Sequence, residues 1–343
     1  MASRSCALSI ELSGDEPGYG CRLSSGQSHD LVTTETGGIR DRGTVLEDNV
    51  SITTGDFRSK VTSSTLLDKK QKHEPITCIT AYDYVSARLV DEAGIDMVLV
   101  GDSLGMVMLG YENTLPVTVD EMLHHTRAVR RGVKRAFLVA DMPFASYHVS
   151  GKETIRNAAR FIKDGAEAVK IEGGEKRSQL VERLVDAEIP VVGHIGLTPQ
   201  SLHAMGGYKV QGKSLKAVEQ LMHDALALER CGACCVVLEG IPREVAALIT
   251  HEIQIPTIGI GAGPDCDGQV LVFHDVLGLT FAPPAKFVRQ YADLGSTITS
   301  AVQAFKNDVK TGGYPSDAES YHLPKDTLST LQAIADRKRA MQV

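Results

Sequence analysis

The chain has 343 residues, 43% of them hydrophobic, which is enough for one large α/β domain with additional segments. Its formal net charge of -7 provides no basic field for nucleic acid or an anionic membrane, and it contains no Trp for an aromatic single-strand platform. No run approaches the roughly 20 apolar residues that span a bilayer. We therefore expect neither a nucleic acid nor a membrane among its partners.

Residues 1–72 differ in composition from the rest of the chain. They are rich in Ser, Thr, Gly and Asp without a sustained apolar period, so burial cannot offset the entropy lost on ordering. We expect a mostly disordered N-terminal extension. Arginines among its serines are typical of a mitochondrial targeting segment, whereas Glu11, Asp15 and Glu16 are unusual in one and keep a cytoplasmic location open as the alternative.

From Ile76 onward, short apolar runs alternate with helical segments. Such runs are typical of buried parallel strands. The repeat predicts a (β/α)₈ barrel over residues 73–323, with an open doubly wound sheet as the alternative, and a helical tail over 324–343. The expected strands are 76–81, 97–101, 137–140, 168–171, 190–193, 234–238 and 256–260, with the eighth somewhere in 269–279.

Capping residues and glycines indicate where the intervening helices begin and end. Thr118 with Glu121, and Ser150 with Glu153, have the spacing of a capping box, and Gly is common just beyond a helix C-terminus. The expected helices are 86–93, 118–131, 150–165, 176–187, 214–230 and 242–252, with a short helix starting at 198.

Cys231 and Cys234 form a C-x-x-C pair at the junction of a helix and a strand. A zinc or redox site is one interpretation, but no second Cys or His pair completes a set of four zinc ligands. We favour packing in the core, where a free Cys behaves as a small hydrophobic residue.

Three carboxylates stand at the ends of apolar strands. Asp102 follows the second strand, Asp141 the third and Glu172 the fourth. In a barrel these ends meet on one rim, where reacting groups collect. Clustered carboxylates repel unless a cation or a shared proton neutralises them, and their hard oxygens suit Mg²⁺. The pattern predicts a Mg²⁺ site, with capping of the next turn as the alternative for each Asp.

Ser103, Lys170 and His194 are candidates for binding an anionic substrate. Ser103 offers a hydroxyl and a backbone N–H beside Asp102. Lys170 shares a strand face with Glu172, so it is either an anion-binding group or one half of a structural ion pair. His194 follows the fifth strand and is expected to contact substrate, with hydrogen-bonded scaffolding as the alternative.

Glu239 is the candidate general base. It ends the apolar sixth strand and precedes Gly240, and a partly desolvated carboxylate suits proton transfer near neutral pH. The alternative is that it caps the helix expected from Pro242.

Taken in order, these segments resemble the ketopantoate hydroxymethyltransferase family. The likeness runs from about residue 76 to about 323, and the ordered set is far more specific than any one piece. The matching segments are 80–83 (TAYD), 100–105 (VGDSLG), 114–118 (TLPVT), 141–144 (DMPF), 170–174 (KIEGG), 193–200 (GHIGLTPQ), 206–212 (GGYKVQG), 258–263 (IGIGAG) and 267–269 (DGQ).

The resemblance implies a (β/α)₈ barrel of the phosphoenolpyruvate/pyruvate type that acts as a one-carbon transferase. The implied substrates are 3-methyl-2-oxobutanoate and 5,10-methylenetetrahydrofolate, and the implied product is 2-dehydropantoate, a precursor of pantothenate and coenzyme A. It also implies Mg²⁺ or another divalent metal and a homo-oligomer, commonly a decamer. The implied residues are Asp102, Asp141 and Glu172 for the metal, Asp102, Ser103, Asp141, Lys170 and His194 for the substrate, and Glu239 for catalysis.

Two other functions remain open at this stage. A Mg²⁺-dependent 2-oxo-acid lyase or mutase of the isocitrate lyase and phosphoenolpyruvate mutase type would use a similar acid cluster. The lyases, however, rely on a reactive Cys in a short loop, and no Cys follows the third or fourth strand here. A non-catalytic barrel that serves as a scaffold is the second alternative, because a fold alone does not guarantee activity.

Overall fold

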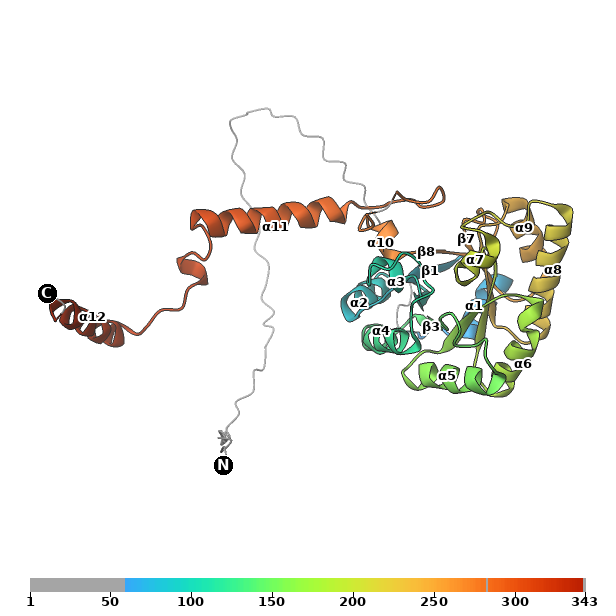
Figure 1. The fold of residues 1–343 in the computed structure, drawn as a ribbon, viewed down its shortest axis with the longest axis horizontal. Coiled ribbons are helices and arrows are strands. Elements are labelled where there is room, and N and C mark those ends of the chain that lie inside the picture. The colour runs from blue at the N-terminus through green and yellow to red at the C-terminus, as the bar shows by residue number, and fades with distance from the viewer. Residues whose placement is uncertain (1–58, 282, 342–343) are drawn as a thin grey trace, which may run out of the picture. The chain divides into compact units, whose positions relative to one another are not determined.

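The computed structural model describes residues 59–281 and 283–341. Eight parallel strands close into a barrel in the order β1 to β8, with β8 pairing back onto β1 (Figure 1). The predicted barrel is therefore confirmed, and the open sheet is wrong. The strands are β1 (Ile76–Thr80), β2 (Met97–Val100), β3 (Phe137–Asp141), β4 (Ala168–Glu172), β5 (Val191–Gly196), β6 (Cys235–Glu239), β7 (Thr257–Ile260) and β8 (Gly268–Leu271).

Helices connect the strands from β1 to β7 and pack around the barrel, as Figure 1 shows for α4, α5, α6, α8 and α9, whereas a loop without a helix joins β7 to β8. At α4 both bonds of the predicted capping box between Thr118 and Glu121 are present, whereas Ser150 caps α5 by a single bond from the Glu153 amide. The helices are α1 (Ser63–Gln71), α2 (Tyr84–Glu92), α3 (Leu104–Val107), α4 (Val119–Gly132), α5 (Gly151–Lys163), α6 (Ser178–Asp186), α7 (Leu202–Met205), α8 (Leu215–Arg230), α9 (Arg243–Glu252), α10 (Phe273–Val276), α11 (Leu294–Thr311) and α12 (Lys325–Ala340), with short 3-10 turns η1 (Glu175–Arg177), η2 (Pro199–Ser201) and η3 (Asp317–Glu319).

The core has two layers because side chains alternate across each strand. Leu99 and Val139 point into the barrel, where they pack with the other inward residues. Val98 and Leu138 point outward and pack against helix residues such as Phe161. Both faces of most strands are thus buried, which explains why the strands are nearly continuous apolar runs.

The N-terminal boundary of the barrel lies earlier than expected. Residues up to 72 are predicted to be a polar extension, but α1 belongs to the barrel, since Leu66 is fully buried in the inner core. Lys69 Nζ also lies 3.0 Å from Oδ2 of the buried Asp96. These contacts join residues far apart in sequence. The short polar helix α1 has no apolar period from which they could be predicted. The rest of the predicted extension, residues 1–58, lies outside the described residues.

The eighth strand also differs from the prediction. It lies at the start of the expected window and ends at Leu271, because its register with β1 pairs Ile76 with Gly268. Any Cβ at Gly268 would collide with the Ile76 backbone, so this glycine permits a strand where it is more often taken to mark a turn. The predicted helical tail contains α12. None of the described helices combines the length and the apolar character needed to cross a membrane.

Candidate active site

The carboxyl ends of β2, β3 and β4 bring the three predicted acids to one rim. Asp141 ends β3 and pairs in register with Lys170 of β4, while Asp102 lies two residues beyond β2. Asp102, Asp141 and Glu172 are all buried. The backbone N–H of Asp102 donates to Oδ2 of Asp141 at 3.0 Å, which links two of the acids directly.

This cluster has an unusual electrostatic state. Burial, together with the charges of Asp141 and Glu172, raises the pKa of Asp102 well above its usual range. Burial likewise raises the pKa of Asp141, although the positive charge of Lys170 opposes the rise. Removing carboxylates from water is costly, and their mutual repulsion adds to the cost. The rim therefore favours any cation that can approach these oxygens.

The oxygen atoms differ in how far the protein already satisfies them. Among the described residues, Oδ1 of Asp141 is buried and accepts no hydrogen bond, and the cation close to it is Lys170 Nζ at 3.2 Å. Glu172 is more fully engaged, because its Oε2 accepts the backbone N–H of Gln200 at 3.0 Å. In this part of the chain no three His, Cys, Asp or Glu side chains converge as a ready set of metal ligands. Asp102 and Asp141 are thus the pair that best fits Mg²⁺, which commonly takes one or two carboxylates and completes its shell with water.

Lys170 pairs with Asp141, and the structural Lys170–Glu172 pair considered from the sequence is not the contact observed. Lys170 Nζ lies 3.2 Å from Oδ1 of Asp141 and 3.2 Å from Nδ1 of His194. Burial alone would lower the pKa of Lys170, but the surrounding carboxylates outweigh it and raise the pKa. Lys170 is therefore a buried ammonium group at neutral pH, paired with Asp141.

His194 lies between two glutamates. Its Nδ1 is 3.5 Å from Oε1 of Glu172, and its Nε2 is 3.2 Å from Oε2 of Glu239. Burial and the Lys170 charge act to lower the pKa of His194, but the two carboxylates raise it to about 9. The Glu239 side chain is 17% exposed, against 3% for Glu172. Glu239 is thus the acid of this pair that is accessible to a ligand.

Ser103 is positioned by Tyr82. The Tyr82 hydroxyl and Ser103 Oγ are 2.8 Å apart, and Tyr82 is fully buried beside β1. Ser103 is half-buried and directly precedes α3, which the sequence analysis did not predict. Its hydroxyl therefore stands next to Asp102 in a set direction, as the proposed contact with substrate requires.

Two further residues of the site were missed from the sequence. Gln200 donates through Nε2 to Oδ2 of Asp102 at 2.9 Å and accepts at Oε1 from the Tyr147 hydroxyl at 2.6 Å. Gln200 lies in η2, directly after Pro199, and belongs to the segment 193–200 on which the family resemblance rests. That membership is the one signal in the sequence that could have singled it out, since burial of an amide leaves no local pattern.

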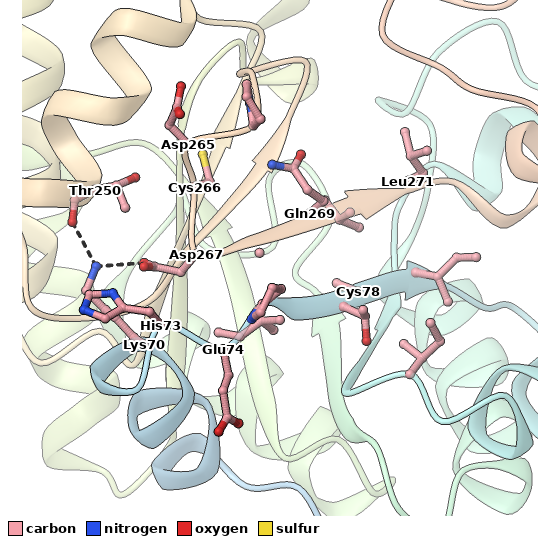
Figure 2. Close-up of a pocket in the computed structure, with 18 of the residues that line it drawn as sticks. Lys70, His73, Glu74, Cys78, Thr250, Asp265, Cys266, Asp267, Gln269 and Leu271 are labelled. Carbon is pink, nitrogen blue, oxygen red and sulfur yellow. Dashed lines mark hydrogen bonds and ion pairs between the residues drawn. The ribbon is translucent and has the colours of Figure 1, made fainter. Parts of the chain in front are cut away.

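A separate cavity of about 640 Å³ lies beside β1 and β8 and contains none of these residues. Figure 2 shows Cys78 and Gln269 on its walls, and Lys70 bonded to Asp267 and to the backbone of Thr250. Because it lacks the converging acids and the buried cations, this cavity is not the candidate active site.

Comparison with known proteins supports the family suggested by the sequence. The family model described as ketopantoate hydroxymethyltransferase matches residues 60–317. A 3-methyl-2-oxobutanoate hydroxymethyltransferase of Koribacter versatilis is 75% identical over 294 residues, which cover 85% of this chain and 100% of that protein. Another from Syntrophomonas wolfei is 53% identical over 274 residues, covering 80% and 99%.

Solved structures with low sequence identity share the fold. Phosphonopyruvate hydrolase, crystallised with oxalate and Mg²⁺, superimposes with a TM-score of 0.51 at 14% identity, covering 82% of this chain and 98% of the other. The trigonal crystal form of 2,3-dimethylmalate lyase, a member of the PEP mutase/isocitrate lyase superfamily, gives 0.50 at 16% identity, covering 82% and 94%. At such identities the likeness establishes the barrel and nothing about the reaction.

Proposed function

Because the chain belongs to the ketopantoate hydroxymethyltransferase family, we propose that it transfers a hydroxymethyl group from 5,10-methylenetetrahydrofolate to 3-methyl-2-oxobutanoate, giving 2-dehydropantoate. The observation that carries the proposal is the rim itself. Buried acids, the Lys170 ammonium and a more exposed Glu239 lie together there. This combination suits a 2-oxo acid that must be held by its charge and then lose a proton. The product would feed the synthesis of pantothenate and coenzyme A.

The acid cluster is the proposed metal site. Asp102 and Asp141 would hold Mg²⁺ or another divalent ion, and Glu172 stays a predicted ligand. When bound, the metal supplies Lewis-acid polarisation of the 2-oxo group. Oδ1 of Asp141 supports this assignment, because it accepts no hydrogen bond in the described part of the chain and its close cation is Lys170 Nζ at 3.2 Å, so it can still share its charge with a metal ion.

Lys170, Ser103 and His194 would bind and orient the oxo acid. Lys170 Nζ is buried between Asp141 and His194, so an anion that approaches it gains a charge-assisted contact away from bulk water. The same ammonium would stabilise negative charge on the substrate after proton removal. Ser103 Oγ, held by Tyr82, can donate to the substrate carboxylate.

Glu239 would act as the base. It takes the proton from C3, and the electrons of that C–H bond form the enolate. Water replaces the two C–N bonds that hold the one-carbon unit on the folate, and its two protons pass to the nitrogens of the departing tetrahydrofolate. The enolate carbon forms a C–C bond to the released carbon, which is at the oxidation level of formaldehyde, and the resulting alkoxide takes the proton back from Glu239. Nε2 of His194, 3.2 Å from Oε2 of Glu239, would orient this carboxylate to accept the proton.

Assembly and location are also proposed. A homo-oligomer is proposed from the family resemblance, which suggests a decamer, and light scattering of the purified chain would test it. Import into mitochondria directed by residues 1–72 is proposed with the cytoplasm as the alternative, and a reporter fused behind this segment would distinguish them.

The decisive experiment measures turnover. Purified protein is incubated with 3-methyl-2-oxobutanoate and methylenetetrahydrofolate, with Mg²⁺ and after chelation, and 2-dehydropantoate is detected by mass spectrometry. Metal-dependent product that collapses in Glu239→Gln supports the proposal. A folded protein that binds Mg²⁺ and the oxo acid but forms no product would overturn it and direct attention to lyase or mutase activity.

A further inference from the structure

A buried amide joins two of the acids of the rim. Gln200 is only 5% exposed. In the described part of the chain, the charged residues within hydrogen-bond distance of it are Asp102 and Glu172. Its backbone N–H donates to Oε2 of Glu172, while its side chain reaches Asp102. Gln200, which follows β5, therefore contacts Asp102 after β2 and Glu172 at the end of β4.

The orientation of this amide is determined by its neighbours. The Tyr147 hydroxyl accepts the backbone N–H of Glu172 at 3.2 Å, so its own proton is free to go to Gln200 Oε1 at 2.6 Å. Gln200 Nε2 lies 3.0 Å from the backbone oxygen of Met142, which can only accept. Turning the amide over would place its oxygen against that carbonyl and against Asp102. The amide nitrogen must therefore face Asp102.

We propose that Gln200, oriented by Tyr147, is a positioning residue that sets the carboxylates of Asp102 and Glu172 for divalent-metal binding. By engaging Oδ2 of Asp102 and Oε2 of Glu172, it fixes the rotation of both groups and leaves the other oxygen of each for a cation or a cationic side chain. This inference rests on the proposed function only in placing a divalent metal at these acids.

A neutral amide suits this task better than a charged group. A Lys at position 200 would pair with Asp102 and compete with the metal for its charge, whereas an amide holds the oxygen without neutralising it. Positioning partners of this kind generally contribute about 10- to 100-fold in metal affinity or activity. Buried hydrogen-bonded networks also lose more than one contact when a member is removed.

The test is metal binding measured without turnover. Mg²⁺ alone is titrated calorimetrically into the full chain as wild type, Gln200→Met and Tyr147→Phe, and Mn²⁺ is titrated in parallel by electron paramagnetic resonance. We expect Gln200→Met to raise the Kd for the metal about 10- to 100-fold. Tyr147→Phe should raise it less, since the Gln200 amide remains but is free to turn. The matched control is Gln254→Met, because Gln254 is exposed next to the N-terminal end of β7.

Turnover measurements then distinguish a role of Gln200 in positioning the metal ligands from a role in stabilising the fold. If Gln200 positions the ligands, saturating Mg²⁺ restores part of the lost kcat in Gln200→Met, whereas a structural role would lower Tm and leave Kd unchanged. An unchanged Kd in both variants, or a wild type that binds neither metal, overturns the inference. Should Gln200→Met fail to fold, Tyr147→Phe tests the same link. A Kd shift in a protein that makes no product would sustain the inference while the proposed reaction fails.

Discussion

Nε2 of His194 lies 3.2 Å from Oε2 of Glu239, and the two side chains come from the neighbouring strands β5 and β6. The second glutamate beside the ring, Glu172, is almost wholly buried and is bonded to Gln200. The imidazole thus stands between an enclosed carboxylate and an accessible one. This difference in surroundings supports the proposal that Glu172 lies on the metal side of the site and that Glu239 transfers the proton.

Glu239→Gln should remove the base without removing the substrate site. We expect kcat to fall about 10²- to 10⁴-fold, the range of general-base contributions, with little change in KM for the oxo acid. Steady-state kinetics measure both constants, and calorimetry with Mg²⁺ confirms that the metal site is intact. A variant that retains most of its kcat would exclude Glu239 as the base.

Metal removal should abolish turnover and lower thermal stability. A ligand that binds only the folded state stabilises it by about 2.7 kcal/mol at a concentration of 100 times Kd. Scanning calorimetry with Mg²⁺ and with a chelator should therefore show a higher Tm with the metal. Asp141→Asn loses the carboxylate charge that is proposed to hold the metal, so its Tm should not respond to Mg²⁺. A response equal to that of the wild type would rule out Asp141 as a ligand.

Gly196→Ala should disturb Glu239 through the backbone. Gly196 has φ +94°, and a Cβ there would collide with the carbonyl oxygen of Glu239 in the adjacent strand. We expect a loss of at least about 1–2 kcal/mol in the free energy of unfolding from the left-handed backbone alone, together with a reduced kcat. Gly312→Ala is the matched control, since Gly312 also has positive φ (+75°) but nothing lies within 4 Å of its added Cβ. Equal kcat in both variants would contradict this coupling.

Acid should destabilise the folded protein through Asp96, which directly precedes β2. Burial would raise the pKa of Asp96, but hydrogen bonds from Thr77 and the charge of Lys69 outweigh it and lower the pKa. A carboxyl with a lowered folded-state pKa contributes stability that is complete above about pH 4, its unfolded pKa, and is lost as pH falls through the folded value.

Denaturant unfolding of wild type and Asp96→Asn between pH 3 and pH 7 measures this contribution. The variant should be less stable at pH 7, and the difference between the two proteins should shrink as pH falls below about 4. A difference that stays constant over this range would show that Asp96 does not supply the pH dependence.

Leu66→Ala should show that α1 belongs to the barrel. Leu66 is fully buried in the inner core, so the truncation should cost about 2–5 kcal/mol in the free energy of unfolding. Leu331→Ala on α12 is the control, because Leu331 is 51% exposed. Equal losses in the two variants would contradict the assignment of α1 to the barrel and favour a domain boundary near residue 72.

Local pattern determined much of this protein. Apolar runs such as 97–100 specify strands, and the residue at the end of each parallel strand must lie on the same rim as the others. The placement of Asp102, Asp141, Glu172 and Glu239 near one another therefore followed from the sequence. Hydrophobic periodicity and strand polarity are local properties, so they can be determined without knowing the contacts.

Tertiary structure alone decided the partners of these residues. No sequence period shows that Gln200 bonds to Asp102, that Lys170 pairs with Asp141, or that α1 packs its Leu66 into the inner core. Each contact joins elements distant in sequence, and each depends on barrel closure and strand register. Burial then sets the charge state of the rim, because only the closed fold removes water from the acids and brings cations within about 3 Å of them.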